Sequence, residues 1–265
     1  MYSKFQLVFK YFNYYLTASN GKGHGIHSPF IFEFITKILN DKEGFFMIEV
    51  IETLRKKMIA DKTIVAVEDF GAGSSIHKTN QRSISSIAKY AAKSKKYAQL
   101  LFRMVKIYRP QTIIEMGTSL GLTTAYLAAG NPKAKIITLE GAKDLAKIAR
   151  INFGQLDFNH IQLTEGNFDN TLSIILSQLS SVDFSFIDGN HQKEPTERYF
   201  RQLLKKVHND SILIFDDIHW SQEMEEAWKT IQQHESVRCT IDLFFMGIVF
   251  FRKEFKEKQH FKIRF

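Results

Sequence analysis

Two acidic positions, each at the end of an apolar segment, offer the chemistry of a metal site. Asp188 follows the letters Phe-Ser-Phe-Ile, and the pair Asp216 and Asp217 follows Ile-Leu-Ile-Phe. If these segments are neighbouring parallel strands, three carboxylates converge, and carboxylates without a counter-charge resist ionising together. A divalent cation removes this conflict, and Mg²⁺ prefers carboxylate, water and substrate oxygens. We therefore predict that Asp188, Asp216 and Asp217 bind a metal; the alternatives are a turn for Asp188 and a helix cap for Asp217.

A histidine stands three residues after the first aspartate, in Asp188-Gly-Asn-His191. Its ring can face the same pocket and take a proton from a hydroxyl group that a metal has made more acidic. We predict that His191 is the catalytic base. His219, which precedes Trp220 and a helical pattern, is a second candidate, for which a structural role is the favoured interpretation.

A glycine loop, Glu115-Met-Gly-Thr-Ser-Leu-Gly121, lies between an apolar segment and a helical pattern. Gly117 lets the chain turn tightly, and Gly121 lets the helix pack closely. Backbone N–H groups of such a loop, here around Thr118 and Ser119, can bind a polar ligand. The spacing differs from the Gly-x-Gly-x-x-Gly of nicotinamide enzymes, which disfavours that class.

Acidic and polar residues near this loop suggest what the ligand is. Glu115 can accept a hydrogen bond from an α-ammonium group, and Glu140, at the end of the next apolar segment and before Gly141, can accept from both ribose hydroxyls. Asn167 falls where an adenine ring would lie, although a turn role explains it equally well. The set predicts an S-adenosylmethionine site formed by Glu115, Gly117, Thr118, Ser119, Gly121, Glu140, Gly141, Asn167 and Asp188.

A parallel sheet would position these residues, because ligands bind beyond the carboxyl ends of its strands. Short apolar runs alternate with helical patterns from residue 112 onward, which predicts such a sheet with helices on both faces. The expected strands are 112–115, 135–140, 161–164, 182–188 and 211–216, and the expected helices are 122–129, 142–153, 171–179, 197–207 and 223–233.

The chain ends differently, in two apolar runs separated by almost nothing. Residues 238–245 and 247–252 predict an antiparallel hairpin that turns at Met246-Gly247. The basic tail 253–265 either pairs as an extra edge segment or stays loose. The predicted fold is α/β: a Rossmann-like class I methyltransferase sheet, mainly parallel, with seven strands and the last one antiparallel.

The N-terminal part has another character, with helical patterns at 30–39, 46–60 and 84–93. We predict that residues 1–95 form a helical cap with lid loops and that residues 96–265 form the catalytic domain that binds S-adenosylmethionine. Residues 5–16 predict an amphipathic helix, either packed on the domain, which is favoured, or docked on a membrane surface.

Two glycine-rich loops lie in this N-terminal part. In the first, Ser28 is expected to cap a helix that begins at Pro29, whereas the competing hypothesis makes His24 and His27 substrate-binding residues of a lid. The second, 68–75, resembles a cofactor loop and is interpreted as a segment that closes over the site.

Composition limits the class of protein. The 265 residues include one cysteine, Cys239, which cannot form an intramolecular disulfide. The sequence has neither an apolar run that would span a bilayer nor the pattern of a signal peptide, so we expect a cytoplasmic protein. The net charge is +8, and the excess lies in residues 1–110, with 18 Lys and Arg against 8 Asp and Glu. That surplus suits an acidic substrate, a nucleic acid or an anionic surface; a solvated helical face is the favoured explanation.

With these motifs, residues from about 97 to 252 resemble class I metal-dependent O-methyltransferases of the catechol and caffeoyl-CoA type. Phe-Ile-Asp-Gly-Asn-His191 with Phe-Asp-Asp217 is more similar to magnesium-dependent sugar O-methyltransferases of macrolide biosynthesis. That resemblance implies metal ligation by Asp188, Asp216 and Asp217 and a base role for His191. A histidine and an aspartate stand where catechol-type enzymes have lysine and asparagine, which argues against phenolic substrates. The whole chain also resembles a group of methyltransferases from Bacteroidetes-type bacteria.

The predicted function is therefore S-adenosylmethionine-dependent, Mg²⁺-dependent O-methylation of a small hydroxylated acceptor. The alternative is an RNA- or protein-modifying methyltransferase whose basic N-terminal part docks its substrate; neither an Asn-Pro-Pro-Tyr-like motif nor a catalytic cysteine pair is present. A degenerate cofactor-binding module and an oxidoreductase are disfavoured. Nucleic acid is a less favoured partner than a small molecule, and a homodimer is left open.

Overall fold

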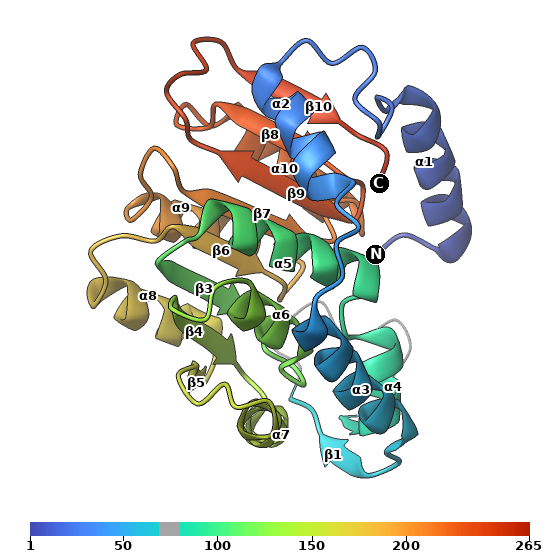
Figure 1. Ribbon diagram of the computed structural model, residues 1–265, viewed down its shortest axis with the longest axis vertical. Helices are drawn as coiled ribbons and strands as arrows, with labels where there is room; N and C mark the ends of the chain where they lie inside the picture. Colours follow the sequence, from blue (N-terminus) through green and yellow to red (C-terminus); the bar gives the residue numbers. More distant parts are fainter. Residues whose placement is uncertain (69–79) are drawn as a thin grey trace. The chain divides into compact units, whose positions relative to one another are not determined.

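The computed structural model describes residues 1–68 and 80–265 and divides the chain into two compact units. Unit 1 consists of residues 1–41 and 175–265, and unit 2 consists of residues 42–174. Both units combine helices with mainly parallel strands (Figure 1). The predicted division of roles between residues 1–95 and 96–265 stays a prediction.

Unit 2 contains three parallel strands in the order β3-β4-β5 and a separate antiparallel pair, β1 and β2. Each parallel strand is followed by a helix, as in a βαβ unit. The elements are α3 (Phe46–Ala60), β1 (Ile64–Ala66), β2 (Gln81–Ser83), α4 (Ile84–Tyr90), α5 (Lys95–Tyr108), β3 (Thr112–Met116), α6 (Leu122–Gly130), β4 (Lys135–Glu140), α7 (Lys143–Gln155) and β5 (Gln162–Glu165). Helix α8 (Phe168–Ser177) contains the boundary with unit 1.

Unit 1 contains five strands in the order β10-β8-β9-β7-β6. Strands β6 and β7 are parallel, and β9 is antiparallel to both β7 and β8. The elements are α1 (Lys4–Thr17), α2 (Pro29–Phe34), the π-helical turn η1 (Ile35–Leu39), β6 (Phe184–Ile187), α9 (Lys193–Leu204), β7 (Ile212–Asp216), α10 (Gln222–Gln233), β8 (Cys239–Asp242), β9 (Met246–Phe250) and β10 (Gln259–Lys262).

Helices cover both faces of β9. On one face the ring of Phe250 contacts Phe30 and Phe34 of the α2 helix, at 5.0 and 6.2 Å between centroids. On the other face Gly247 lies against the indole of Trp228 in α10. Successive strand residues point to opposite faces, so this alternation buries the strand on both sides (Figure 1).

The predicted fold class is confirmed: the strands are mainly parallel and Gly247–Phe250 pairs antiparallel to its neighbours. The tail supplies an additional strand, β10, which pairs parallel to β8, so the described strands beyond the β1–β2 pair number eight rather than seven. Helix α5 and the β1–β2 pair have no counterpart among the predicted elements.

Two local predictions are wrong. The hairpin turns at residues 243–245 instead of Met246-Gly247, because Phe244 adopts a left-handed φ of 68° and its N–H donates to the Asp242 side chain. Ser28 occupies the N-cap position of α2 but its side chain makes no capping hydrogen bond. The proposed closing segment 68–75 lies outside the described residues except for Glu68.

We predict that Gly247→Val destabilises the protein, because a Cβ at this position would lie 2.7 Å from the Trp228 ring, which has no room to move inside the core. Overpacking of this kind costs about 1–3 kcal/mol. Urea unfolding measures it. Gly154→Ala is the matched control, since nothing lies within 4 Å of its Cβ and the position is helical; equal stability of the Gly247→Val protein and the wild type would contradict the packing.

Candidate functional site

The ends of β6 and β7 bring the predicted metal residues together. The two strands pair in parallel with Ile187 opposite Phe215, so Asp188 and Asp216 follow at the same edge. Ligand atoms of Asp188, His191 and Asp216 all lie within 4.8 Å of one another. His191 Nε2 is 3.5 Å from Asp188 Oδ1. This group matches three of the four residues predicted for the metal and the base.

Asp217 lies next to this group but does not belong to it. Its backbone is left-handed, with φ of 52°, and its N–H donates to the carbonyl oxygen of Phe245 at 2.7 Å. It is not a helix cap, because Ser221 is the N-cap of α10 and accepts from Met224 N–H. Ligation by Asp217 stays a prediction.

The backbone around these side chains is strained. Asn190, His191 and Asp217 all have positive φ, at 69°, 35° and 52°. Non-glycine residues adopt such conformations at a cost of order 1–3 kcal/mol; Asn, Asp and His do so more readily than most, and such residues cluster at active sites and turns. Here the strained residues flank the group that Asp188 and Asp216 form.

The carboxylates control the protonation of His191. Burial lowers the pKa of its imidazole, but the hydrogen bond with Asp188 and the charges of Asp217, Asp188 and Asp216 raise the pKa to about 9. Without a cation His191 therefore carries a proton at neutral pH. A cation among the carboxylates would cancel this attraction and favour the neutral ring that a base requires.

The loop after β3 has the predicted turn geometry. Gly117 and Gly121 have φ of 103° and 78°, and Gly121 is the N-cap of α6. A Cβ on Gly121 would lie 2.6 Å from the Phe153 ring, which explains the close helix approach inferred from sequence. Ser119, with φ of 51°, completes the turn.

Glu140 holds this loop through its carboxylate. One oxygen accepts from Ser119 N–H at 2.7 Å and the other from Ala142 N–H at 2.8 Å. Burial raises the pKa of the Glu140 carboxyl, although the N–H groups of Ala142, Ser119 and Gly141 oppose that shift. Each carboxylate oxygen has a second lone pair, so a pair of ribose hydroxyls remains compatible with these bonds.

Glu115 is fully buried, and its carboxylate accepts from the hydroxyl groups of Thr124 and Thr138. Thr138 also bonds to the Thr118 hydroxyl at 2.6 Å. Neither Thr124 nor Thr138 was predicted as a site residue, although hydroxyl residues on an otherwise apolar helix and strand are a signal that the sequence offers. A contact between Glu115 and the cofactor stays a prediction.

Asn167 has the turn role that was its alternative interpretation. Its side-chain oxygen accepts from Asp169 N–H at 2.9 Å, and its carbonyl accepts from Asn170 and Thr171 at the start of α8. Contact with an adenine ring stays a prediction, as does the direct part of Gly141 and Asp188 in cofactor binding.

His219 has the structural role that was its favoured interpretation. Its Nδ1 lies 3.0 Å from Glu225 and its Nε2 lies 2.9 Å from Asp242, and its ring stacks on Phe244. Burial lowers the pKa of His219, but the hydrogen bonds with Asp242 and Glu225 outweigh it and raise the pKa. Each ring nitrogen faces a carboxylate, so the protonated ring can donate to both, and neither nitrogen is left for a substrate.

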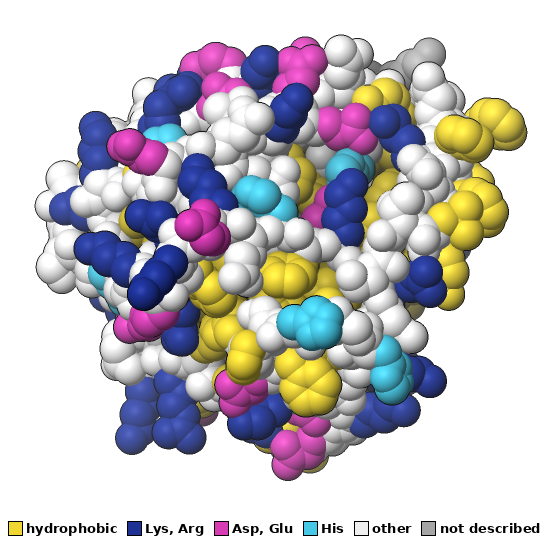
Figure 2. Space-filling view, turned by 90° about the horizontal axis from the view of Figure 1, so that it is seen from above, with side chains coloured by type: hydrophobic (Ala, Val, Ile, Leu, Met, Phe, Trp, Pro, Cys, Tyr) yellow, Lys and Arg dark blue, Asp and Glu magenta, His cyan; other side chains and the backbone are white. Residues whose placement is uncertain are grey.

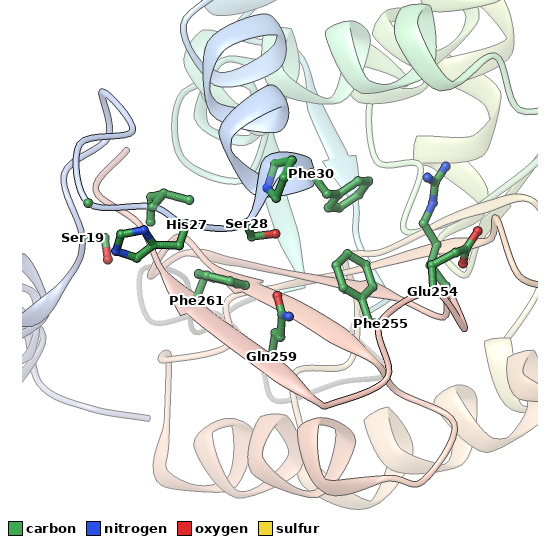
Figure 3. Close-up of a pocket in the computed structure, with 12 residues that line it drawn as sticks. Ser19, His27, Ser28, Phe30, Glu254, Phe255, Gln259 and Phe261 are labelled. Atoms are coloured by element: carbon green, nitrogen blue, oxygen red, sulfur yellow. The ribbon is translucent and has the colours of Figure 1, made fainter.

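His27 lies elsewhere in unit 1, in a pocket of about 740 Å³ beside β10 (Figure 3). Ser28 and Phe30 line it from the N-terminal side, and Phe255, Gln259 and Phe261 line it from the other. Strand β10 is three positions from β7, or roughly 14 Å at about 4.8 Å per strand. His27 is not part of the Asp188 group. A substrate-binding role of His24 and His27 stays a prediction.

Residues 114–218 match a family model described as a methyltransferase domain. No curated protein sequence matches the chain. Among solved structures, the O-methyltransferase of Bacillus cereus in complex with SAH is similar, with 19% identity, a TM-score of 0.56, and coverage of 82% of this chain and 96% of that one.

Two further structures cover less of this chain. TomG, the O-methyltransferase of Streptomyces achromogenes involved in tomaymycin synthesis, in complex with SAM, has 17% identity, a TM-score of 0.53, and coverage of 61% and 82%. The SAH-bound methyltransferase PaMTH1 of Podospora anserina has 16% identity, a TM-score of 0.55, and coverage of 62% and 81%. At these identities the likeness concerns the fold.

The strand order and the glycine loop are those of a class I methyltransferase. With the domain match, they indicate a methyltransferase domain whose fold is similar to that of methyltransferases solved with SAM or SAH, O-methyltransferases among them. No helix within residues 1–68 and 80–265 is long and apolar enough to cross a membrane.

We predict that Glu140→Gln weakens S-adenosylmethionine binding roughly tenfold, the scale of one charged hydrogen bond. Because the Glu140 pKa is raised, wild-type affinity should fall on acidification at a higher pH than an ordinary glutamate would give, and the variant should lack this step. Calorimetry across a pH series measures both. Glu165→Gln, in register with Glu140 but paired with Arg150 at the surface, is the control and should bind normally.

We predict that His219→Gln lowers the free energy of unfolding by about 2 kcal/mol at acidic pH, because two charged hydrogen bonds are lost. The raised pKa means that this stabilisation is fully present below the ordinary value near about 6.5 and is lost as pH rises through the folded-state pKa. Urea unfolding at several pH values measures the difference. His208→Gln, which removes a more exposed ion pair with Asp183, should change little; a pH-independent His219 effect would contradict this explanation.

Proposed function

We propose that this methyltransferase transfers the methyl group to a hydroxyl oxygen of a small acceptor and that the reaction requires a divalent cation. The oxygen ligands favour Mg²⁺ as that cation. The observation that carries the proposal is the group of Asp188, His191 and Asp216 within 4.8 Å at the ends of two parallel strands.

The donor atoms present fit such a cation. Asp188 and Asp216 offer carboxylate oxygens, and Asp217 is the proposed third ligand. Mg²⁺ selects oxygen over imidazole nitrogen, so the ring of His191 is left for proton transfer. Direct ligation by His191 would instead favour a transition metal.

The protein's own residues then have separate tasks. Bound Mg²⁺ would lower the pKa of a hydroxyl group beside it, and bound S-adenosylmethionine would supply an electrophilic methyl group. His191 would accept the hydroxyl proton as the oxygen attacks, on the ring nitrogen that does not face Asp188, because Asp188 Oδ1 lies 3.5 Å from Nε2 and orients the ring. Glu140 and the loop around Ser119 would hold the ribose and methionine parts of the cofactor. Alignment of oxygen and methyl group supplies most of the remaining catalysis.

We predict that chelation abolishes methyl transfer while cofactor binding is nearly unchanged, and that Asp216→Asn reproduces this loss. His191→Ala should lower the maximal rate by about 10² to 10⁴, with a smaller loss at high pH because hydroxide replaces the base. Release of labelled methyl groups to a panel of hydroxylated compounds measures the rate. Asp183→Asn, at the other end of β6 beside His208, is the control.

A second measurement needs no turnover. Because His191 carries a proton without metal, Mg²⁺ binding at neutral pH should release a proton, seen by calorimetry in buffers of different ionisation enthalpy. His191→Ala should remove that release. Full activity after exhaustive chelation, together with an active His191→Ala protein, would overturn the proposal.

A further inference from the structure

Helix α1 exposes its most apolar side. Phe5, Phe9 and Phe12 are 83%, 68% and 59% exposed, and Val8 and Leu16 are also exposed. These residues recur at the three- and four-residue spacing of one helix face. Figure 1 shows α1 with one side uncovered, and Figure 2 shows apolar side chains protruding at the edge of the molecule where α1 lies.

The helix is held firmly by its opposite side. Ser3 and Gln6 form a capping box at its start. Lys10 forms a salt bridge with Glu225 of α10 at 3.0 Å, and Tyr14 is buried against Phe244, with its hydroxyl donating to the Ile263 carbonyl. An amphipathic helix normally packs its apolar stripe against the core of its domain. A well-anchored helix whose apolar stripe faces solvent therefore indicates that something apolar outside the protein contacts it.

The charges around the stripe favour an anionic surface. Residues 1–32 contain Lys4 and Lys22, besides the Lys10 that pairs with Glu225 on the opposite side, and no aspartate or glutamate. Arg264 lies over the ring of Tyr15, which borders the stripe. Apolar side chains with lysine and arginine at their border are typical of helices that lie in the headgroup region of anionic bilayers. A second copy of α1 would instead bring like charges together.

The same helix contacts the edge of unit 1 that carries the metal group. Tyr11 lies 5.0 Å from Phe244 and 6.0 Å from Phe245 between ring centroids. The carbonyl of Phe245 accepts from the N–H of Asp217, and the Tyr2 N–H donates to the Trp220 carbonyl. A surface bound by α1 therefore lies at the strand ends that bear Asp216 and Asp217.

We infer that α1 docks the enzyme on an anionic lipid bilayer, with the Phe5, Phe9 and Phe12 side chains inserted among the headgroups, and that the acceptor is a hydroxylated amphiphile held in that bilayer. The second half rests on the proposed O-methyl transfer. The first half rests on exposure, charge and anchoring alone.

Vesicle flotation of the full chain tests the docking. Vesicles of phosphatidylcholine mixed with phosphatidylglycerol should carry the protein, vesicles of phosphatidylcholine alone should carry less, and high salt should weaken binding. The triple variant Phe5→Ser, Phe9→Ser, Phe12→Ser should bind at least tenfold more weakly, with an unchanged thermal unfolding transition because these side chains are exposed. Phe46→Ser, which removes an equally exposed phenylalanine from α3, is the matched control and should bind normally.

The docking would be overturned if the wild type did not float or if the triple variant floated as well as the wild type. It would also be overturned if vesicles bound neither protein and light scattering showed a wild-type dimer and a monomeric triple variant. The last result would assign the stripe to a contact between copies. None of these readouts needs cofactor, metal or turnover, so they are independent of the proposed reaction.

The acceptor is tested by incubating the enzyme with labelled S-adenosylmethionine and vesicles of extracted bacterial lipid. Label should enter the organic phase, and His191→Ala should lose labelling while still floating. Label confined to water-soluble products would overturn the lipid acceptor. Absence of any transfer, with flotation intact, would likewise overturn the lipid acceptor, whereas the docking and the proposed O-methyl transfer would both stand.

Discussion

The parallel pairing of β6 with β7 is the constraint on which the metal group depends. Register sets Ile187 opposite Phe215, and the next residue of each strand is an aspartate, so two carboxylates meet wherever this core packs correctly. The strands are held by apolar burial on both faces, with Phe184, Phe186 and Phe215 fully buried. Packing energy thus opposes electrostatic repulsion, and the resulting negative field acts on the nearest titratable ring, His191.

The cofactor loop also depends on a carboxylate at the end of a parallel strand, but there the charge is balanced by the protein's own N–H groups. Glu140 also ends a parallel strand, but its charge meets N–H groups of the loop and of the following turn, so no cation is needed. Glu115, one strand away and wholly buried, is satisfied by threonine hydroxyls. The carboxylates predicted as site residues therefore have three environments: other carboxylates for Asp188 and Asp216, backbone N–H groups for Glu140, and buried hydroxyls for Glu115. Only the first of these invites a metal.

The sequence was sufficient for the parallel strands because each is a short apolar run followed by a turn, and for the hairpin direction because two such runs adjoin. It was not sufficient for the turn itself. The left-handed Phe244 is stabilised locally by the Asp242 side chain, but also by packing with Tyr14 and His219, and these two are tertiary contacts. Strand β10 has a polar sequence and forms because the edge of β8 offers unpaired backbone groups. Helix α5 was not predicted, although Leu101, Met104 and Val105 recur at the spacing of one buried helix face.

A histidine follows the end of each of the two strands in a similar sequence motif, Asp-Gly-Asn-His191 and Asp-Asp-Ile-His219. Only the three-dimensional surroundings of the two rings distinguish their roles. His219 donates from both nitrogens to carboxylates that are themselves protein-bound, so its charge is part of the fold. His191 faces the Asp188 carboxylate with Nε2, and that carboxylate is one that a cation would bind. The carboxylate charges stabilise the proton on the His191 ring, and the ring can lose this proton when a cation neutralises those charges. This difference, rather than the shared motif, makes His191 the residue suited to accept a proton during a reaction.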